Sequence, residues 1–332
     1  MSLFMGLDVG GTGTRCLICR EDGKAVSYGE AGPGSHEVVG YDGLKKALAK
    51  ASGAALDKAG IKARDIAGLG AGMAGYDWPS DRAKNLEVLK SLGTKGPIVI
   101  KNDAALGLAA MANEGINLSS GTSNNCYGYW KGREGRLAGA GFLAGEEGGG
   151  LEAAILAVRA VNHARIKRIL PTSLSKKLVE QAGFDSADSF IEAIGRGQLF
   201  PKAEWAPLIF SEAADGDSAA MGIVQRCGEE LGFSALAVLN QLGMDSFFLP
   251  QTFPVVLSGS LFRLKPPLAK IVERTLMAHA PCAAHLKLIE LAAPPVCGAI
   301  VFVMNELGMN TDELRPNLLE SASAINTKTG DE

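Results

Sequence analysis

The residues best placed to do chemistry stand in LFMGLDVGGTGTRCLICR, residues 3–20. This stretch predicts an apolar strand ending near Asp8, a glycine-rich turn over residues 10–13, and a second strand after Thr14. Because glycine has no Cβ and accepts positive φ, such a turn lets backbone N–H groups approach an anion such as a phosphate. Asp8 would then hold a hard cation such as Mg²⁺ beside that anion. A tight hairpin that binds nothing is the alternative.

A second candidate is Asp103, with Asn102 beside it, between the predicted strand 97–101 and the predicted helix 104–112. Functional groups of mixed α/β sheets gather at the carboxyl ends of strands, where Asp8 and Asp103 both fall. A carboxylate there can accept the proton of an acceptor hydroxyl in phosphoryl transfer, or it can cap the helix. Asp77, in GYDWPSD after another predicted strand, has a binding and a capping interpretation too.

A weaker copy of the opening pattern begins after Gly115. Residues 116–120 predict a strand, GTSNN at 121–125 a second turn of small residues, and 126–130 the returning strand. Such an echo is expected of a protein made from two copies of one motif. The glycine-dense segment 139–150 follows and carries the adjacent Glu146 and Glu147.

The elements that must position these residues alternate between strands and helices. Further strands are predicted over 25–29, 66–72, 253–257 and 286–291, and further helices over 41–59, 79–92, 151–168, 267–280 and from 294 to about 307. The order predicts an α/β protein with helices on the faces of mixed sheets. The predicted domains are 1–114, joined by the C-terminal helix near 308–320, and 115–307, with a helical insertion over about 170–245. Phe190 and Phe200 are assigned to the core of that insertion, and the polar tail beyond Leu318 is expected to be frayed.

Composition narrows the class of protein. Of the 332 residues, 47% are hydrophobic and 21% charged, as in a soluble globular protein. A net charge of −3 with no basic run makes nucleic acid and anionic membranes poor partners. Because Asp8 interrupts the first apolar run, we expect neither a signal peptide nor a membrane span, and therefore a cytoplasmic protein.

Six cysteines are scattered along the chain, and Cys16 and Cys19 form a CxxC. Inside a strand, this odd spacing sends the two side chains to opposite faces. With no second pair and no neighbouring histidine, reduced core cysteines are a better interpretation than a zinc site.

Five segments together resemble a known family: DVGGTGTR at 8–15, KNDAALG at 101–107, SGTSNN at 120–125, LSGSL at 257–261 and CGA at 297–299. In order and spacing they are similar to the actin/hexokinase/Hsp70 superfamily, and within it to the BadF/BadG/BcrA/BcrD-type ATPases that include N-acetylglucosamine kinase. The resemblance covers nearly the whole chain. It implies two ribonuclease-H-like (actin-like ATPase) α/β domains with a nucleotide cleft between them, ATP and Mg²⁺ as cofactors, and a homodimer.

The resemblance also implies roles for individual residues. Asp8 is the carboxylate on the Mg²⁺ side, and Asp103 is the base for the acceptor hydroxyl. The nucleotide would be bound by Gly10, Gly11, Thr12, Gly13 and Thr14, by Gly121 and Thr122 as the second phosphate turn, and by Gly259 and Ser260 against the adenosine. The acceptor would be bound by Asp77, Asn102, Asn125 and Glu146.

The chain departs from the family pattern mainly on the acceptor side. Glu146 and Glu147 stand in Gly-Glu-Glu-Gly where sugar kinases of this group show Gly-Asp-Glu-Gly, and Ala74 and Phe142 replace residues usual at their positions. The expected function is ATP-dependent phosphorylation of a hydroxyl on an amino sugar or N-acetylhexosamine. The alternative is an ATPase that activates a reductase or dehydratase through a bridging iron–sulfur cluster, for which Cys126 is the one cysteine near a glycine-rich turn.

Overall fold

The computed structural model describes residues 2–244 and 252–329. The chain forms two compact units. The first consists of Met1–Asn117, Tyr127–Arg133 and Ile289–Glu332, and the second of Leu118–Cys126 and Glu134–Leu288. The last residue of the predicted insertion, 245, lies outside the described residues.

The first unit is built on a five-stranded sheet in the order β3-β2-β1-β4-β5. Its strands are β1 (Leu3–Val9), β2 (Thr14–Arg20), β3 (Ala25–Ala31), β4 (Ile66–Met73) and β5 (Ile98–Asn102). β1 pairs antiparallel with β2 and parallel with β4, which pairs parallel with β5. The carboxyl ends of β1, β4 and β5 therefore share one edge of the sheet.

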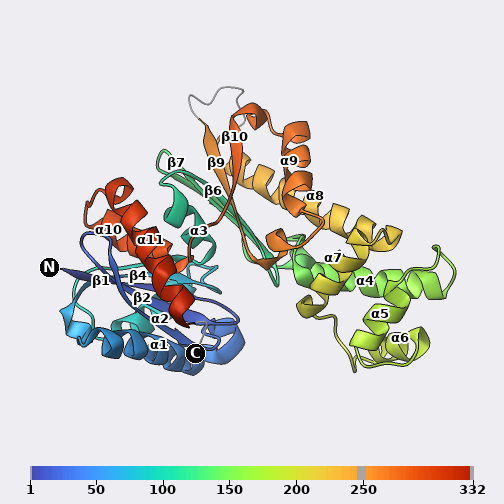
Figure 1. Ribbon diagram of the computed structural model, residues 1–332, viewed down its shortest axis with the longest axis horizontal. Helices are drawn as coiled ribbons and strands as arrows, with labels where there is room; N and C mark the ends of the chain where they lie inside the picture. The colour runs from blue at the N-terminus through green and yellow to red at the C-terminus, as the bar shows by residue number, and fades with distance from the viewer. Residues whose placement is uncertain (1, 245–251, 330–332) are drawn as a thin grey trace. The chain divides into compact units, whose positions relative to one another are not determined.

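Helices cover both faces of this sheet (Figure 1). They are α1 (His36–Ala59), α2 (Asp81–Lys90), α3 (Ala104–Met111), α10 (Val296–Glu306) and α11 (Thr311–Thr329), with a 3₁₀ turn, η1 (Ala63–Asp65). Met5 and Cys16 belong to the core under α1 and α2, whereas Phe4 and Cys19 belong to the core under α3, α10 and α11. The expectation that the two CxxC cysteines point to opposite faces is thus confirmed.

The apolar helix α10 belongs to the first unit, so the predicted boundary at residue 307 is wrong. Nine of its residues are buried, and it lies directly on β1 and β4. A Cβ on Gly70 would be 1.8 Å from the carbonyl oxygen of Ala299, and one on Gly6 3.0 Å from that of Val296. Only glycine allows this close approach of helix and sheet.

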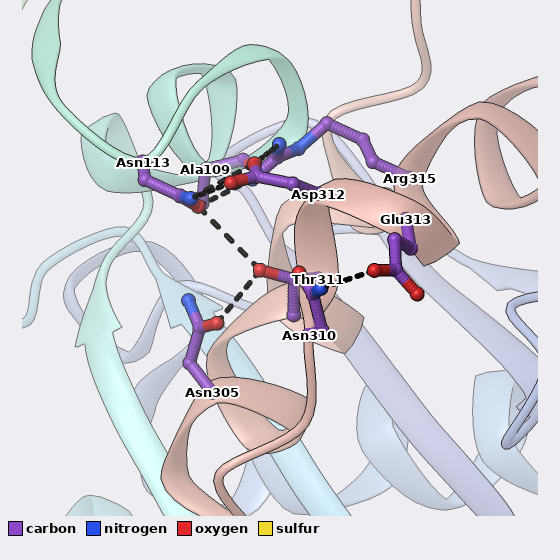
Figure 2. Close-up of polar contacts among 8 residues, drawn as sticks. All are labelled: Ala109, Asn113, Asn305, Asn310, Thr311, Asp312, Glu313 and Arg315. Carbon is purple, nitrogen blue, oxygen red and sulfur yellow. Dashed lines mark hydrogen bonds and ion pairs between the residues drawn. The ribbon is translucent and has the colours of Figure 1, made fainter.

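The tail beyond Leu318 is helical to Thr329 rather than frayed, because α11 is fastened to the end of α3 (Figure 2). Arg315, 8% exposed, donates to the carbonyl oxygen of Ala109 at 3.3 Å and to Oδ1 of Asn113 at 2.6 Å, and it pairs with Asp312 at 2.6 Å. Asn113 in turn donates to both carboxylate oxygens of Asp312 at 2.9 Å. Arg315 thereby satisfies a carbonyl near the C-terminus of α3 that helix geometry leaves without a partner.

The second sheet has the order β10-β9-β6-β7-β8. Its strands are β6 (Gly115–Ser120), β7 (Asn124–Trp130), β8 (Arg133–Arg136), β9 (Phe253–Ser258) and β10 (Leu286–Glu290). The helices that follow these strands are α4 (Gly150–Arg165), α5 (Leu174–Gln181), α6 (Ala187–Gly195), α7 (Ala206–Ala214), α8 (Ser218–Gln241) and α9 (Leu268–His279). Short 3₁₀ turns are η2 (Phe142–Ala144), η3 (Ala203–Trp205), η4 (Ser260–Arg263) and η5 (Ala283–His285).

Helices α5 to α8 form the predicted helical region, and Phe190 is completely buried in it. Phe200 is 70% exposed, so its assignment to the core is wrong. It stands in the irregular connection between α6 and η3, where no helix face directs it inward. Among the described residues, no helix is long and apolar enough to cross a membrane.

Candidate active site

Three aspartates stand at the shared carboxyl edge of the first sheet. Asp8 is the last but one residue of β1, Asp103 follows β5 directly, and Asp77 comes four residues after β4. Along the sheet Val9 pairs with Met73, and Met73 with Asn102, which aligns the ends of the three strands. The side chain of Asp8 has the same parity as Phe4, so it is on the face that α3 and α10 cover.

Asp103 occupies the N-cap position of α3, but its side chain makes no capping hydrogen bond. The cap comes instead from Asn102, whose Oδ1 accepts from the backbone N–H of Ala104 at 3.0 Å. Burial and the nearby carboxylates of Asp8 and Asp77 raise the pKa of Asp103 to about 7. A carboxyl group with this pKa can both take up and release a proton near neutral pH.

Asn102 also holds Asp77 in place. Its Nδ2 donates to Oδ1 of Asp77 at 2.8 Å and, more weakly, to the carbonyl oxygen of Tyr76 at 3.4 Å. The N-cap residue of α2 is Ser80. Asp77 is 6% exposed, whereas Trp78 beside it is 50% exposed. A half-exposed indole next to a buried carboxylate is a combination that sequence reasoning missed.

Asp8 pairs with Arg15, whose Nη1 lies 3.2 Å from Oδ2 of the carboxylate. Burial raises the pKa of Asp8 and the guanidinium of Arg15 opposes that rise. Arg15 was not expected at the site, although the two positions are symmetric about the turn and pair directly across β1 and β2. Opposite charges at matched positions of a hairpin were the signal that could have identified it.

The side chains around Asp8 fit only one mode of Mg²⁺ binding, in which the ion is shared with substrate phosphates and water. Within residues 2–244 and 252–329, no three His, Cys, Asp or Glu side chains are grouped to hold a metal ion. Mg²⁺, however, is commonly bound by one or two carboxylates together with substrate phosphates and water. A single buried carboxylate beside a glycine turn suits such a shared ion, and not a metal held by protein ligands alone.

The first glycine turn is closed by a hydrogen bond from the N–H of Gly10 to the carbonyl oxygen of Gly13 at 2.9 Å. None of its glycines has a positive φ, so that part of the expectation is wrong. What the turn offers is exposed backbone, because Gly11 and Thr12 are exposed and carry little or no side chain. Thr14 differs, since it is fully buried and its hydroxyl oxygen faces Gly34. Its side chain is unavailable to a phosphate.

The second glycine turn, at residues 121–123, lies in the second unit. There the segment SGTSNN at 120–125 contacts the segment LSGSL at 257–261. Gly121 donates to the carbonyl oxygen of Ser123 at 3.0 Å, and Thr122 is exposed. Gly259 lies against the backbone of Ser120, the residue before this turn, because a Cβ on Gly259 would be 2.1 Å from the carbonyl oxygen of Ser120. With a φ of 96°, Gly259 needs glycine for its backbone conformation as well. The exposed Ser260 follows at the start of η4.

The acidic loop before α4 uses its carboxylates within the second unit. Glu146 accepts from the N–H groups of Gly139 at 3.1 Å and Gly141 at 3.0 Å, which closes the loop on itself. Glu147 pairs with Arg226 at 2.7 Å. Asn125, which belongs to β7 rather than to the turn, accepts from the N–H of Cys126 at 2.8 Å.

Comparison with sequence models of protein families shows which family this chain belongs to. The sequence model of the BadF/BadG/BcrA/BcrD ATPase family matches residues 5–281. The chain belongs to this family. The match includes both glycine turns and the three aspartates of the first sheet.

Two curated relatives of this BadF/BadG/BcrA/BcrD-type chain are named as sugar kinases. An N-acetylmuramic acid/N-acetylglucosamine kinase from Clostridium acetobutylicum is 30% identical over 251 residues, which are 74% of this chain and 82% of the relative. An N-acetyl-D-glucosamine kinase from Dictyostelium discoideum is 25% identical over 319 residues, 91% of this chain and 98% of the relative.

Solved structures show the same fold. A candidate N-acetylglucosamine kinase from Chromobacterium violaceum matches with a TM-score of 0.69 and 22% identity, over 91% of this chain and 99% of the other. A ROK family glucokinase from Streptomyces griseus, in complex with glucose and AMPPNP, matches with a TM-score of 0.58 and 17% identity, over 91% and 98%. The predicted fold class, two α/β units of the sugar-kinase type, is therefore confirmed for this BadF/BadG/BcrA/BcrD-type protein.

Proposed function

We propose that this protein is an ATP-dependent kinase that transfers the γ-phosphate to a hydroxyl group of an N-acetylhexosamine or a related amino sugar. The named activities of the two curated relatives support this class of reaction. The structural observation that supports the proposal most strongly is the state of the Asp103 carboxyl group. This carboxyl group is released from helix capping by Asn102, and its pKa lies at about 7.

In this proposal the glycine turns bind the phosphates of ATP. The N–H groups of Gly10 and Gly121 close their own turns, so the N–H groups of Gly11–Gly13 and of Thr122 would donate to the phosphate oxygens. Gly259 and Ser260 would contact the adenosine. Asp8 would hold Mg²⁺, which supplies charge neutralisation on the phosphates when it is bound. Arg15 keeps the carboxylate of Asp8 in place from the neighbouring strand.

Asp103 acts as the general base. The acceptor hydroxyl oxygen forms a bond to the γ-phosphorus while the bond from that phosphorus to the bridging oxygen of ADP breaks, and the hydroxyl proton moves to the carboxylate of Asp103. Asp77 and Asn102 orient the acceptor, and Trp78 offers it an apolar face. Asn125 and the loop that Glu146 closes would contribute to binding of the acceptor as well.

The decisive experiment is an ADP-release assay with Mg²⁺-ATP over a panel of acceptors. The panel contains N-acetylglucosamine, N-acetylmuramic acid, N-acetylmannosamine, glucosamine and glucose, and mass spectrometry of the product identifies a sugar monophosphate. We expect ADP release in proportion to one N-acetylhexosamine and none above background with Asp103→Asn. If ATP binds and no sugar is phosphorylated, the proposal is refuted.

The activator alternative requires a cysteine that can bind an iron–sulfur cluster. Cys126 is fully buried, and burial raises the pKa of its thiol, so it stays protonated and out of reach of a bridging cluster. We therefore expect no stoichiometric iron or sulfide in protein purified without oxygen. A homodimer and a cytoplasmic location stay predictions from the sequence, and light scattering of the purified protein tests the first.

A further inference from the structure

The second glycine turn does not stand alone, because a triple-glycine turn at the start of α4 is hydrogen-bonded to it. The N–H of Gly150 donates to the carbonyl oxygen of Gly121 at 2.8 Å, and that of Leu151 to Thr122 at 2.9 Å. Ser120 Oγ donates to the carbonyl oxygen of Gly148 at 2.8 Å. The two turns therefore share three hydrogen bonds, and displacement of one must move the other.

These two turns also touch directly. A Cβ on Gly149 would be 2.5 Å from the Cα of Ser123, so the backbones approach as closely as glycine permits. Asn124 adds a further link, since its Nδ2 donates to the carbonyl oxygen of Glu147 and to Ser234 Oγ at 3.0 Å. The position of residues 147–150 therefore sets the position of the backbone at Gly121 and at the exposed Thr122.

The side chain that fixes residues 147–150 is Glu152, in the first turn of α4 and 6% exposed. Its Oε2 accepts from the N–H of Gly148, as a glutamate at the third helical position does when it reaches back over the helix start. Its Oε1 lies 3.6 Å from Nε of Arg226, whose Nη2 pairs with Glu147 at 2.7 Å. One carboxyl group thus connects the turn, the acidic loop and α8.

We propose that Glu152 is a positioning residue for phosphate binding, because it holds Gly148–Gly150 in the conformation onto which Gly121 and Thr122 are hydrogen-bonded. This inference rests on the proposed function only in calling Gly121–Thr122 a phosphate turn. No phosphate contact is assigned to Glu152 itself.

The protonation state of Glu152 should matter to this arrangement. Burial raises its pKa, and so does the hydrogen bond to Glu147. The charged groups around it are Glu147 from the loop and Arg226 and Glu230 from α8, with Arg159 of α4 acting on Glu147. The N–H of Gly148 and the guanidinium of Arg226 act in the opposite direction, because both favour the ionised carboxylate.

Two substitutions separate this positioning role from a general contribution to stability. Glu152→Gln keeps an oxygen that accepts from Gly148 and gains an NH₂ that donates to Glu147, whereas Glu152→Ala loses both contacts. Glu212→Gln is the matched control. Glu212 is a 2% exposed glutamate of α7 in the same unit, paired with Lys177 at 2.6 Å.

The first readout is hydrogen exchange of the peptides that cover residues 117–125 and 145–155, measured without substrate. We expect exchange at least tenfold faster in both peptides of Glu152→Ala, and wild-type rates in Glu152→Gln and Glu212→Gln. If the peptide 117–125 is unchanged in Glu152→Ala, or if Glu152→Gln behaves as Glu152→Ala does, the proposal is overturned. This readout needs no turnover, so it stands even if no sugar is phosphorylated.

The second readout is the division between KM and kcat. Glu152→Ala should raise KM for ATP by about tenfold, the effect of one lost hydrogen bond to a charged or buried group, and leave kcat within about twofold. Glu152→Gln should keep the KM of the wild type. A drop in kcat with unchanged KM in Glu152→Ala would contradict a positioning role.

Discussion

Asp103→Asn tests the base and its environment in one substitution. A general base contributes about 10²–10⁴ in rate, so we expect kcat to fall by about a thousandfold, or about 4 kcal/mol of transition-state stabilisation. The Kd for ATP should stay within about twofold, because no glycine turn involves this side chain. The substitution should therefore lower kcat without changing the affinity for ATP, as expected for a group that acts only in the transition state.

The same substitution should stabilise the folded protein. The pKa of Asp103 is raised from 3.8 to about 7, and at about 1.4 kcal/mol per pH unit this corresponds to at most about 4 kcal/mol of destabilisation of the ionised form. Since the side chain keeps part of its surface exposed, we expect about 1–2 kcal/mol. In the wild type, the stability that the protonated carboxyl group of Asp103 retains is fully present below pH 3.8 and is lost as pH rises through 7, where the group ionises in the folded protein. The gain in the asparagine variant is therefore absent near pH 4 and complete at pH 8.

The assay is urea unfolding of both proteins at pH 4 and pH 8, beside steady-state kinetics with ATP and the acceptor. Asp42→Asn, in the exposed face of α1, is the control and should change neither measurement. A variant that keeps wild-type turnover would refute the base. A variant that loses turnover but is less stable at pH 8 would refute the electrostatic description of the site.

Four further predictions concern neighbouring features. Asp77→Asn should move the acid limb of kcat/KM, set by Asp103, down by about one pH unit, because a negative neighbour is removed; a limb that stays in place contradicts the cluster. Gly259→Ala should cost at least about 2 kcal/mol in urea unfolding, from positive φ and a backbone clash, and wild-type stability would contradict this packing. Arg315→Ala should cost about 2–3 kcal/mol without rescue by lysine, which lacks the forked geometry; full rescue would argue against the network. Glu146→Ala should raise KM for the sugar about tenfold and leave KM for ATP within twofold, whereas equal rises would indicate a loop role alone.

The first half of the fold was predictable because its signals are local. Residues 3–20 alternate faces as a hairpin must, and the glycines of the turn sit where the strands reverse. The assignment of α10 was not predictable from its own apolar sequence, which fits any buried surface. The signal lay in the strands, since Gly6, Gly68 and Gly70 leave a flat surface on which a helix can rest. Glycines on one face of a strand thus indicate close helix packing rather than a turn.

The prediction that the C-terminal tail is frayed was wrong for a different reason. Residues beyond Leu318 contain few large apolar side chains, so neither periodicity nor propensity predicts a helix there. The helix is held by Arg315, whose partners Ala109 and Asn113 stand about two hundred positions earlier in the chain. Contacts at such sequence separation leave no local trace.

At the site, sequence reasoning found the carboxylates but not the groups that hold them. Asp8 and Asp103 were predictable from their places at strand ends. Arg15 and Glu152 were not, because their roles depend on pairings across a hairpin and over a helix start. The bonds of Glu146 to its own loop were not predicted either, and its contact with the acceptor stays a prediction.

The choice between capping and catalysis at residues 102 and 103 follows from what each side chain can do. Position 102 must accept from the N–H of Ala104 and at the same time donate to Asp77. The amide of asparagine offers an acceptor and donors together, whereas an ionised aspartate offers acceptors only, so asparagine fits here and aspartate would not. An aspartate there would also place a fourth negative charge in the cluster and raise the pKa of Asp103 further. The asparagine therefore caps the helix, orients one carboxylate and leaves the other with a pKa suited to proton transfer.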